Sequence, residues 1–322
     1  MRINQQKSAA LKELEDIENF LKEKSLREIN ESAKKIAGQI LSNVEKLKNT
    51  DEAFLIPRFH AVFKNMSNIL EKSTMSETEE DKRIYFLSFA DTRLVKSLER
   101  IRGQAEEMDV FNEIYCWTQN DIDRDFWEKY KHRMPFDGFD YKSSGFFIWK
   151  PQIITQVLEK MRDGDILLYC DAGNHLHKYG RKRLFDYFNA LKKNETGVLC
   201  FIQEDFLEKE YTKGDIFDYF GCRDNSKIYN TGQMAGNTIL FRKCEKCEDF
   251  VKKWRRIFFD NFELHDADTF NSANFDGFIA NRGEQSTLSI LAKLNGAAIL
   301  NFAELYTFPI TVARDKAYNI HI

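Results

Sequence analysis

An unbroken apolar run that ends in a carboxylate lies near the middle of this 322-residue chain. Residues 164–174 read GDILLYCDAGN, so four apolar or aromatic residues and a cysteine lead directly into Asp171. A short apolar run without alternation is typical of a central strand that is buried on both faces. Open α/β sheets bind their ligands in the crevice at the carboxyl ends of such strands. The segment therefore predicts a mainly parallel α/β sheet with Asp171 facing a ligand crevice.

Asp171 is of the residue type that holds Mg²⁺ or Mn²⁺ against the phosphates of a nucleotide. Asp-x-Asp is the usual arrangement, but here Gly173 follows and the second acid is missing. We therefore predict a Mg²⁺ or Mn²⁺ site with Asp171 and His175 as its protein ligands. A strand-end aspartate that only caps a turn or a helix is the simpler alternative, because short motifs often occur without function.

Composition places the chain among soluble globular proteins. Hydrophobic residues make up 43% of it and charged residues 31%, which is ordinary for a folded domain. The net charge of −3 provides no general attraction to nucleic acid or to anionic membranes. No apolar run approaches a membrane span, and the polar first residues have no signal-peptide pattern. The six cysteines are scattered as buried reduced thiols would be, so we expect a cytoplasmic protein. From the net charge we expect no nucleic-acid partner.

Residues 1–80 differ in texture from the rest of the chain. Apolar residues between Leu26 and Leu47 recur at intervals of three and four, which predicts an amphipathic helix. The polar stretch 73–81 is expected to be a linker or a cap. We predict a helical N-terminal region at 1–80 that packs as a cap. It could instead form a homo-oligomer, hold an acceptor or contact the inner face of a membrane.

Residues 81–322 alternate between strand and helix patterns. Strands are predicted at 84–89, 113–118, 166–170, 197–202, 238–242 and 297–300. Helices are predicted at 94–106, from Pro151 onward, and at 184–192, 244–258 and 285–294. Such alternation indicates a mainly parallel sheet with helices on both faces.

A cation precedes the Asp171 strand by one helix. Residues 141–151 read YKSSGFFIWKP, which places Trp149 and Lys150 at a helix start. A lysine beside the free backbone N–H groups of a helix start forms a site for anions. Twenty residues separate Lys150 from Asp171, enough for one helix and its return strand. We therefore predict that both side chains face one crevice; a core strand with a solvated lysine is the alternative.

The first predicted strand ends in the sequence SFADTR at residues 88–93. In a doubly wound sheet, a carboxylate and an arginine at this point lie near a nucleotide base and ribose. We predict that Ser88, Ala90, Asp91 and Arg93 contact the nucleotide. Alternatively, Asp91 caps the following helix and Arg93 is exposed on it.

Two later segments carry polar side chains suited to a sugar. Residues 231–237 (TGQMAGN) are expected to form a loop in which Gln233 contacts sugar hydroxyls, although ordinary turn chemistry explains the loop almost as well. Residues 281–286 (NRGEQS) open a helix, where Glu284 could serve as a general base and Gln285 could position the donor. An acidic first turn of a helix is the alternative.

Two other groups have features of metal sites. Cys244 and Cys247 have the spacing of half a zinc site, but no second pair follows. His265 lies beside Asp266 and Asp268 and could contact a metal or an acceptor. We expect neither role, since the cysteines fit an exposed helix start and His265 fits a solvated loop.

Taken in order, these segments resemble bacterial GT-A fold glycosyltransferases of capsule and lipopolysaccharide loci. The resemblance runs from about Arg83 to Tyr306, and its most specific part pairs the Trp-Lys-Pro helix start with the strand that leads to Asp171. It is carried by residues 88–91, 145–151, 163–173, 236–242 and 284–286. The resemblance implies a GT-A fold and a nucleoside-diphosphate sugar as donor, with UDP as the expected nucleotide.

The resemblance also implies site roles. Asp171 would be the acid beside the metal and the diphosphate, and Lys150 and Trp149 would lie on the donor side. Gly173 departs from the family's motif, so metal affinity should be weaker, and the enzyme could depend on Lys150 or Arg93 instead.

By the same resemblance, Asp91 and Arg93 would lie near the nucleoside, and Glu284 and Gln285 near the transferred sugar and the acceptor. If the enzyme inverts the anomeric centre, Glu284 is the candidate base; a retaining enzyme needs no such base. We expect a hexosyltransferase-like enzyme that extends a surface glycan, with a glycan or glycolipid as acceptor.

Two alternatives belong to other classes. A phosphohydrolase could use a strand-end aspartate as nucleophile, but Asp171 lacks the usual second acid and follows a middle strand. A non-catalytic scaffold could bind a nucleotide in the α/β body and assemble through the N-terminal helices.

Overall fold

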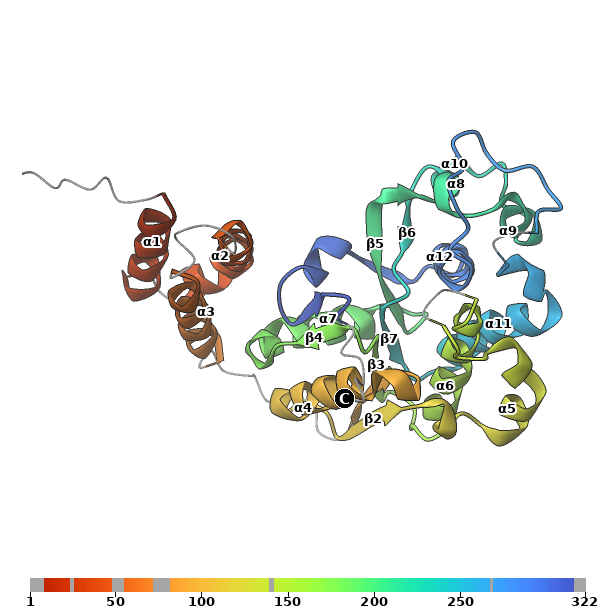
Figure 1. Cartoon of the computed structure of the whole chain (residues 1–322), viewed down its shortest axis with the longest axis horizontal. Helices are drawn as coiled ribbons and strands as arrows, with labels where there is room; N and C mark the ends of the chain where they lie inside the picture. Colours follow the sequence, from red (N-terminus) through yellow and green to blue (C-terminus); the bar gives the residue numbers. More distant parts are fainter. Residues whose placement is uncertain are drawn as a thin grey trace, which may run out of the picture.

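The computed structural model describes residues 9–23, 26–47, 55–71, 82–138, 142–266 and 269–315. Figure 1 shows two parts, a group of helices from the start of the chain and a larger α/β body. The stretch predicted as a linker (73–81), Tyr141 and Asp268 lie outside the described residues.

A seven-stranded sheet forms the centre of the α/β body in the described residues, with the order β2-β1-β3-β7-β5-β6 and with β8 paired to β5. Its strands are β1 (Ile84–Phe89), β2 (Glu113–Trp117), β3 (Ile166–Cys170), β5 (Val198–Leu207), β6 (Gly232–Met234), β7 (Thr238–Arg242) and β8 (Ala298–Asn301). β1 is parallel to β2 and β3, and β8 is parallel to β5, whereas β7 is antiparallel to β3 and β5 and β6 is antiparallel to β5. β1, β2, β3, β5 and β8 therefore share one direction, which confirms the predicted mainly parallel α/β sheet.

Helices cover both faces of the sheet, as predicted (Figure 1). The helices α6 (Trp149–Leu158), α11 (Glu245–Asp260) and α12 (Glu284–Asn295) share one core cluster with Leu87 and Leu167. The helices α4 (Val95–Met108) and α7 (Arg181–Lys193) share the other with Phe86 and Leu168. Alternate residues of a strand point to opposite faces, so both faces of β1 and β3 are buried. This double burial explains why the sequence of β3 is apolar without interruption.

Shorter elements complete the body. They are α5 (Arg124–Tyr130), α8 (Glu208–Tyr211), α9 (Gly214–Tyr219), α10 (Ser226–Tyr229) and an antiparallel pair formed by β4 (Asn174–Leu176) and β9 (Ile310–Val312). The predicted loop at 231–237 is partly wrong, because it contains the strand β6. Gly232 permits this pairing, since a Cβ at that position would collide with the backbone oxygen of Gln203 on β5.

The helices α1 (Ala9–Glu23), α2 (Leu26–Leu47) and α3 (Ile56–Glu71) pack around a hydrophobic cluster of their own. Phe308 of the α/β body belongs to this cluster. Its ring lies edge-on to Phe63 of α3, with 5.9 Å between the ring centroids. The apolar face predicted for Leu26–Leu47 is therefore used for packing within this cluster, and α3 joins the cluster to the body. None of the helices in the described residues is both long and apolar enough to cross a bilayer.

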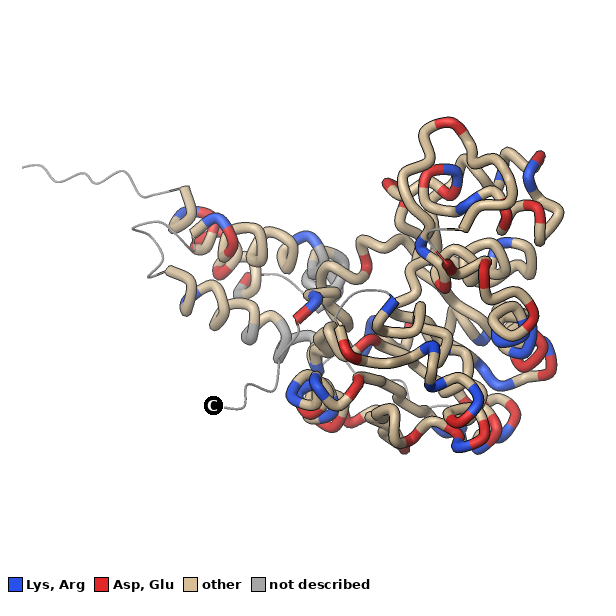
Figure 2. Tube along the Cα trace, turned by 45° about the vertical axis from the view of Figure 1, so that its right-hand side comes forward, with Lys and Arg blue, Asp and Glu red and all other residues tan. Residues whose placement is uncertain are grey.

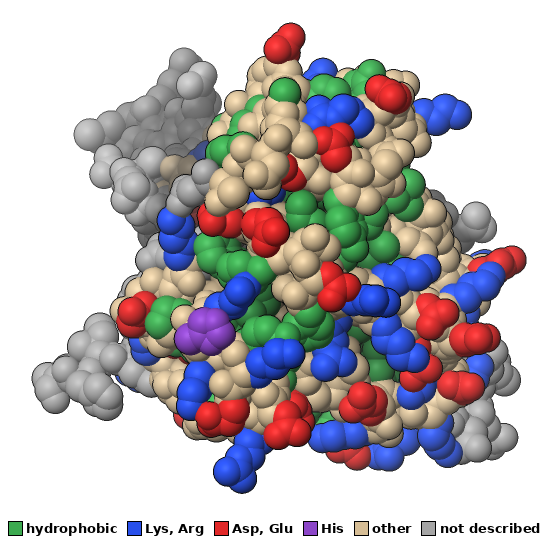
Figure 3. Space-filling view, turned by 90° about the vertical axis from the view of Figure 1, so that its right-hand side faces the viewer, with side chains coloured by type: hydrophobic (Ala, Val, Ile, Leu, Met, Phe, Trp, Pro, Cys, Tyr) green, Lys and Arg blue, Asp and Glu red, His purple; other side chains and the backbone are tan. Residues whose placement is uncertain are grey.

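Charged residues of both signs are distributed along the described chain (Figure 2). The face that carries α5, α9 and α11 shows a central hydrophobic band with Lys, Arg, Asp and Glu around it (Figure 3). Neither sign of charge dominates this face.

Candidate active site

A cleft of about 400 Å³ opens where β1 and β3 end. The structure brings most of the predicted site residues into its lining, namely Ala90, Asp91, Trp149, Lys150, Asp171, Gly173, Glu284 and Gln285. These residues come from the ends of two parallel strands and from the first turns of α6 and α12. The carboxyl edge of a mainly parallel sheet is where such folds bind ligands.

Lys150 lies at the centre of the charged part of the cleft. It belongs to the first turn of α6, and only 3% of it is exposed. Its Nζ donates to the backbone oxygen of Gly236 at 2.9 Å and lies 2.7 Å from Oε1 of Glu284 and 3.6 Å from Oδ1 of Asp171. One ammonium group is therefore shared between two carboxylates from different elements.

Burial and charge act in opposite directions on this group. Loss of hydration raises the pKa of the Glu284 carboxyl to about 7, although the Lys150 ammonium opposes the shift. Burial alone would lower the pKa of Lys150, but the carboxylates of Asp171 and Glu284 outweigh it and the pKa is raised. Lys150 therefore stays charged at neutral pH, while Glu284 can exchange a proton there.

Asp171 follows β3 directly and keeps 42% of its side chain exposed to the cleft. Its Oδ1 accepts a hydrogen bond of 2.6 Å from the hydroxyl of Tyr169, and its backbone N–H donates to Asn237 at 2.9 Å. Burial, together with the nearby Asp171 charge, raises the pKa of Tyr169 well above its usual value. Tyr169 therefore remains a neutral donor that orients the Asp171 carboxylate.

Asp91 both lines the cleft and caps a helix. It accepts a hydrogen bond of 2.9 Å from the backbone N–H of Arg93, and so caps the short 3-10 helix Thr92–Leu94. The Arg93 guanidinium donates to both Asp91 oxygens, at 2.7 and 3.0 Å. Arg93 is not among the residues that line the cleft. The capping alternative is therefore confirmed for Asp91, whose position in the cleft leaves the nucleotide contact a prediction, while Arg93 is bound to Asp91 and lies outside the cleft lining.

Ser88 and Gln233 are fully buried and do not line the cleft. The amide nitrogen of Gln233 donates to the Ser286 hydroxyl at 3.1 Å, and its amide oxygen accepts from Gln285 at 2.8 Å. Gln285 in turn accepts a hydrogen bond of 3.2 Å from the Gly236 N–H. Gln233 therefore lies behind the cleft lining and positions Gln285, which is part of that lining.

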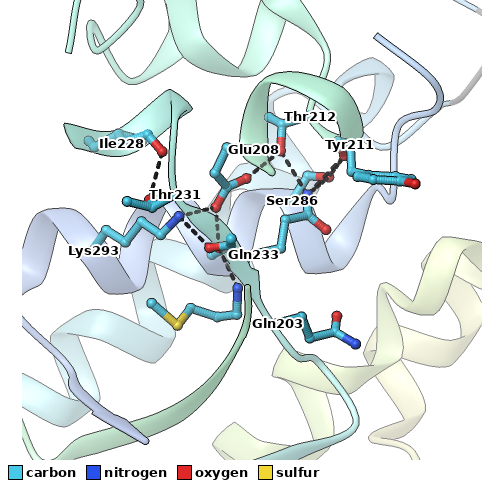
Figure 4. Close-up of polar contacts among 12 residues, drawn as sticks. Gln203, Glu208, Tyr211, Thr212, Ile228, Thr231, Gln233, Ser286 and Lys293 are labelled. Atoms are coloured by element: carbon cyan, nitrogen blue, oxygen red, sulfur yellow. Dashed lines mark hydrogen bonds and ion pairs between the residues drawn. The ribbon is translucent and has the colours of Figure 1, made fainter. Parts of the chain in front are cut away.

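A buried network of ionic and hydrogen-bonding side chains, centred on Glu208, connects α8 to α12 (Figure 4). Glu208 is fully buried, and its Oε1 lies 2.7 Å from the Nζ of Lys293. The hydroxyl of Thr212 donates to the other Glu208 oxygen at 2.6 Å, and Ser289 also bonds to Glu208. The network joins α8 to α12, whose first residues are Glu284 and Gln285.

We expect Lys293→Met to destabilise the protein by about 3–5 kcal/mol, because it leaves Glu208 as an unpaired buried charge. Urea unfolding of the variant measures this loss. Adding Glu208→Gln should restore a large part of it, because the remaining group is neutral. Lys246→Met, which removes a 62% exposed lysine, is the matched control and should change little. An equal effect of the two lysine substitutions would contradict the prediction.

The residues present do not fit the predicted metal site at Asp171 and His175. His175 is absent from the cleft lining; its Nε2 lies 3.1 Å from Asp315, and its Nδ1 lies 3.0 Å from Gln104. In the described part of the chain, no group of three His, Cys, Asp or Glu side chains is arranged to hold a metal. The cation beside Asp171 is the ammonium of Lys150.

The expected solvated loop at His265 is wrong. His265 is fully buried and stacks on Phe258 of α11, with 3.8 Å between the ring centroids. Burial lowers the pKa of His265 to about 3, so the ring is neutral. The reason is that the chain turns directly after α11 and packs His265 back against that helix.

One wall of the cleft was not predicted. Val312, Arg314 and Asp315 line it, although they lie beyond the segments that drew attention in the sequence. The Asp315 N–H donates to the Gly173 oxygen at 3.0 Å, and Arg100 of α4 bonds to Asp315 at 2.7 Å. The segment 312–315 is therefore fixed over the Asp171 turn by contacts between distant parts of the chain, which no local pattern reveals.

The fold and the cleft define an α/β protein with a charged ligand cleft at the carboxyl edge of its sheet. No protein-family model and no curated protein matches the chain. Among solved structures it is similar to a glycosyltransferase involved in the glycosylation of the major capsid of PBCV-1, with a TM-score of 0.37 and 10% identity over 68% of this chain and 83% of that one. It is also similar to the apo form of the bifunctional glycosyltransferase WbbM, with a TM-score of 0.31 and 11% identity over 69% of this chain and 47% of that one. These similarities are weak, so the functional argument depends on the cleft.

Proposed function

We propose that the protein is a GT-A-like glycosyltransferase that moves a sugar from a nucleoside-diphosphate sugar, with UDP as the nucleotide, to a hydroxyl of a surface glycan or glycolipid. The observation that carries this proposal is the Lys150 ammonium, held between Glu284 and Asp171 in one cleft. A cation beside two acids, one of them exposed to the cleft, suits a reaction in which a diphosphate leaves and a hydroxyl loses a proton.

The apolar side of the same cleft suits a nucleoside. Phe89 and Trp149 stack there with 4.0 Å between their ring centroids, and both line the cleft next to Asp91. Both rings are nearly buried, so they form an apolar wall against which a base can pack, and a carboxylate can accept the ribose hydroxyls. A nucleotide placed along this side would direct its diphosphate toward Lys150 and Asp171.

The proposed step exchanges one bond for another. The bond between C1 of the sugar and the diphosphate oxygen breaks, and its electron pair stays on the departing diphosphate. The acceptor oxygen forms a bond to C1 and gives its proton to Glu284. A pKa of about 7 suits Glu284 for this role, because a general base works best near its own pKa. In this proposal the reaction inverts the anomeric centre.

A screen of nucleotides and sugar nucleotides by thermal shift, followed by a hydrolysis assay, tests the proposal. A ligand that binds only the native state stabilises it by about 2.7 kcal/mol at 100 times its dissociation constant, so the melting temperature should rise. UDP-linked sugars should also be hydrolysed slowly. Release of phosphate from a generic phosphate ester would favour the phosphohydrolase, and binding without any turnover would favour the scaffold.

We also propose a cytoplasmic location, with the N-terminal helices acting as a packing cap on the enzyme. The cluster that joins Phe308 to α3 supports this role. Contact of the helices with a membrane or with a second copy would be an additional role.

We expect Gly236→Ala to lower turnover about 100-fold, the loss that a 1 Å misplacement of a reacting group can cause. A Cβ at residue 236 would lie 2.7 Å from Oε1 of Glu284 and would push the carboxylate away from Lys150. Steady-state kinetics with the donor found in the screen measures the effect. Gly103→Ala in α4 is the matched control, because its Cβ meets nothing within 4 Å. Equal activity of the two variants would show that the position of Glu284 is not critical.

A further inference from the structure

Two protein cations border the place proposed for the diphosphate. Lys150 lies in the floor of the cleft, and Arg314 lies in the wall formed by residues 312–315. Arg314 is close above the Asp171 turn, since a Cβ built on Gly173 would lie 3.4 Å from the Arg314 Cα. An anion bound beside Asp171 would therefore lie in a part of the cleft that both Lys150 and Arg314 line.

Lys150 has hydrogen-bonding capacity left for such an anion. An ammonium group has three N–H donors. Two of them are taken by the Gly236 oxygen at 2.9 Å and by Glu284 at 2.7 Å. The remaining contact, to Asp171, is longer at 3.6 Å. One donor of Lys150 can therefore turn to a phosphate oxygen without breaking either short contact.

The wall that carries Arg314 is fixed by its neighbour. Asp315 bonds to the Gly173 oxygen through its N–H and to Arg100 through its carboxylate, at 3.0 and 2.7 Å. The Asp315 carboxylate is thus engaged on the Arg100 side, while Arg314 is exposed at the cleft. The charge of Arg314 also acts on Arg282: burial lowers the pKa of Arg282, Tyr211 opposes this shift, and the nearby Arg314 charge adds to it.

We infer that Lys150 and Arg314 together neutralise the leaving diphosphate, in the place that a divalent cation takes in an Asp-x-Asp site. This inference rests on the proposed function. As the C1–oxygen bond breaks, negative charge grows on the diphosphate, and two charge-assisted contacts stabilise it. The transfer then needs no metal as a co-reactant, because the Lys150 ammonium, 3.6 Å from Asp171, supplies positive charge at this point of the cleft.

Binding of UDP, measured by calorimetry on the full chain, tests this inference directly. The affinity should be the same in excess EDTA and in Mn²⁺ or Mg²⁺, and so should the rate of hydrolysis of the UDP-sugar found in the screen. Arg314→Ala should weaken UDP binding in EDTA about 10- to 100-fold, as expected for the loss of one charged contact. Arg256→Ala, at a side chain that is 78% exposed, is the matched control and should bind UDP normally.

The outcomes separate the two proposals. If UDP binds only when a divalent ion is present, the metal-free assignment is overturned and the transferase proposal stands. If no nucleotide or sugar nucleotide binds with or without metal, the proposed function fails and the inference fails with it. If EDTA has no effect but Arg314→Ala binds UDP as tightly as the unchanged protein, the assignment of Arg314 is overturned. Because Arg314 is exposed, its loss should leave the melting temperature unchanged, and a folded variant is expected in every arm.

Discussion

Replacement of Asp171 by alanine is expected to abolish sugar transfer, with a loss of at least about 1000-fold in turnover, and to leave the fold intact. The carboxylate is 42% exposed in the cleft, and its Oδ1 is oriented by the Tyr169 hydroxyl at 2.6 Å. The variant removes the carboxylate that lies 3.6 Å from the Lys150 ammonium and helps to keep it charged and in position, but it opens no cavity in the core. Its melting temperature should therefore stay close to that of the unchanged protein.

Transfer assays and thermal unfolding on the same preparation measure the two effects of Asp171→Ala. Asp260→Ala provides the matched control, since its side chain is 49% exposed at the end of α11. Near-normal turnover of Asp171→Ala would refute the assigned role. A large fall in melting temperature would mean that Asp171 is structural.

The second large effect is expected for Glu284→Gln, which should lower turnover about 100- to 10,000-fold, because a base is lost from the reacting hydroxyl. The pKa of Glu284 is about 7, and only the ionised form can accept a proton. Turnover of the unchanged enzyme should therefore rise as the pH increases through about 7. The residual turnover of Glu284→Gln should not show this rise. Rates measured from pH 5.5 to 8.5, a range chosen to bracket the pKa by about 1.5 units on each side, test both points.

The contribution of Glu284 to stability should depend on pH in the opposite direction to turnover. Since the folded pKa lies above the ordinary carboxyl value of 4.5, the folded state binds a proton more tightly than the unfolded chain. Its contribution to stability is complete below about pH 4.5 and is lost as the pH rises through about 7. The stability of Glu284→Gln relative to the unchanged protein should therefore increase across this interval. Glu128→Gln, at an exposed side chain, should show no such trend in either assay.

Local sequence patterns predicted the strands and helices that are long or apolar on both faces. β1, β3 and β7 have the predicted bounds, because each forms a central strand whose burial dictates apolar residues. β6 was missed because it has three residues and depends on its pairing with β5. His265 was misplaced because a polar sequence gave no sign of its stacking on Phe258.

The same distinction applies to the cleft. Lys150 and Asp171 could be placed together, since a helix and its return strand separate them along the chain. Asp91 could be placed as well, because β1 is parallel to β3 and ends at the same edge. Arg314 could not be predicted, because its position follows from the pairing of β9 with β4. Gln233 was predicted to contact the ligand, whereas its side chain forms hydrogen bonds with Gln285 and Ser286.

Arg100 shows that a residue outside the cleft lining can determine the position of the residues that line it. It is not in the cleft lining, yet its guanidinium bonds to the Ala172 oxygen at 2.7 Å and to Asp315 at 2.7 Å, across 215 positions of sequence. A random-mutagenesis search for inactive clones should recover Arg100 substitutions beside those of Asp171, although Arg100 touches no substrate. Such substitutions would remove the contacts that hold the segment 312–315, and with it Arg314, in place. The clones would be mistaken for catalytic mutants unless their affinity for the nucleotide were measured.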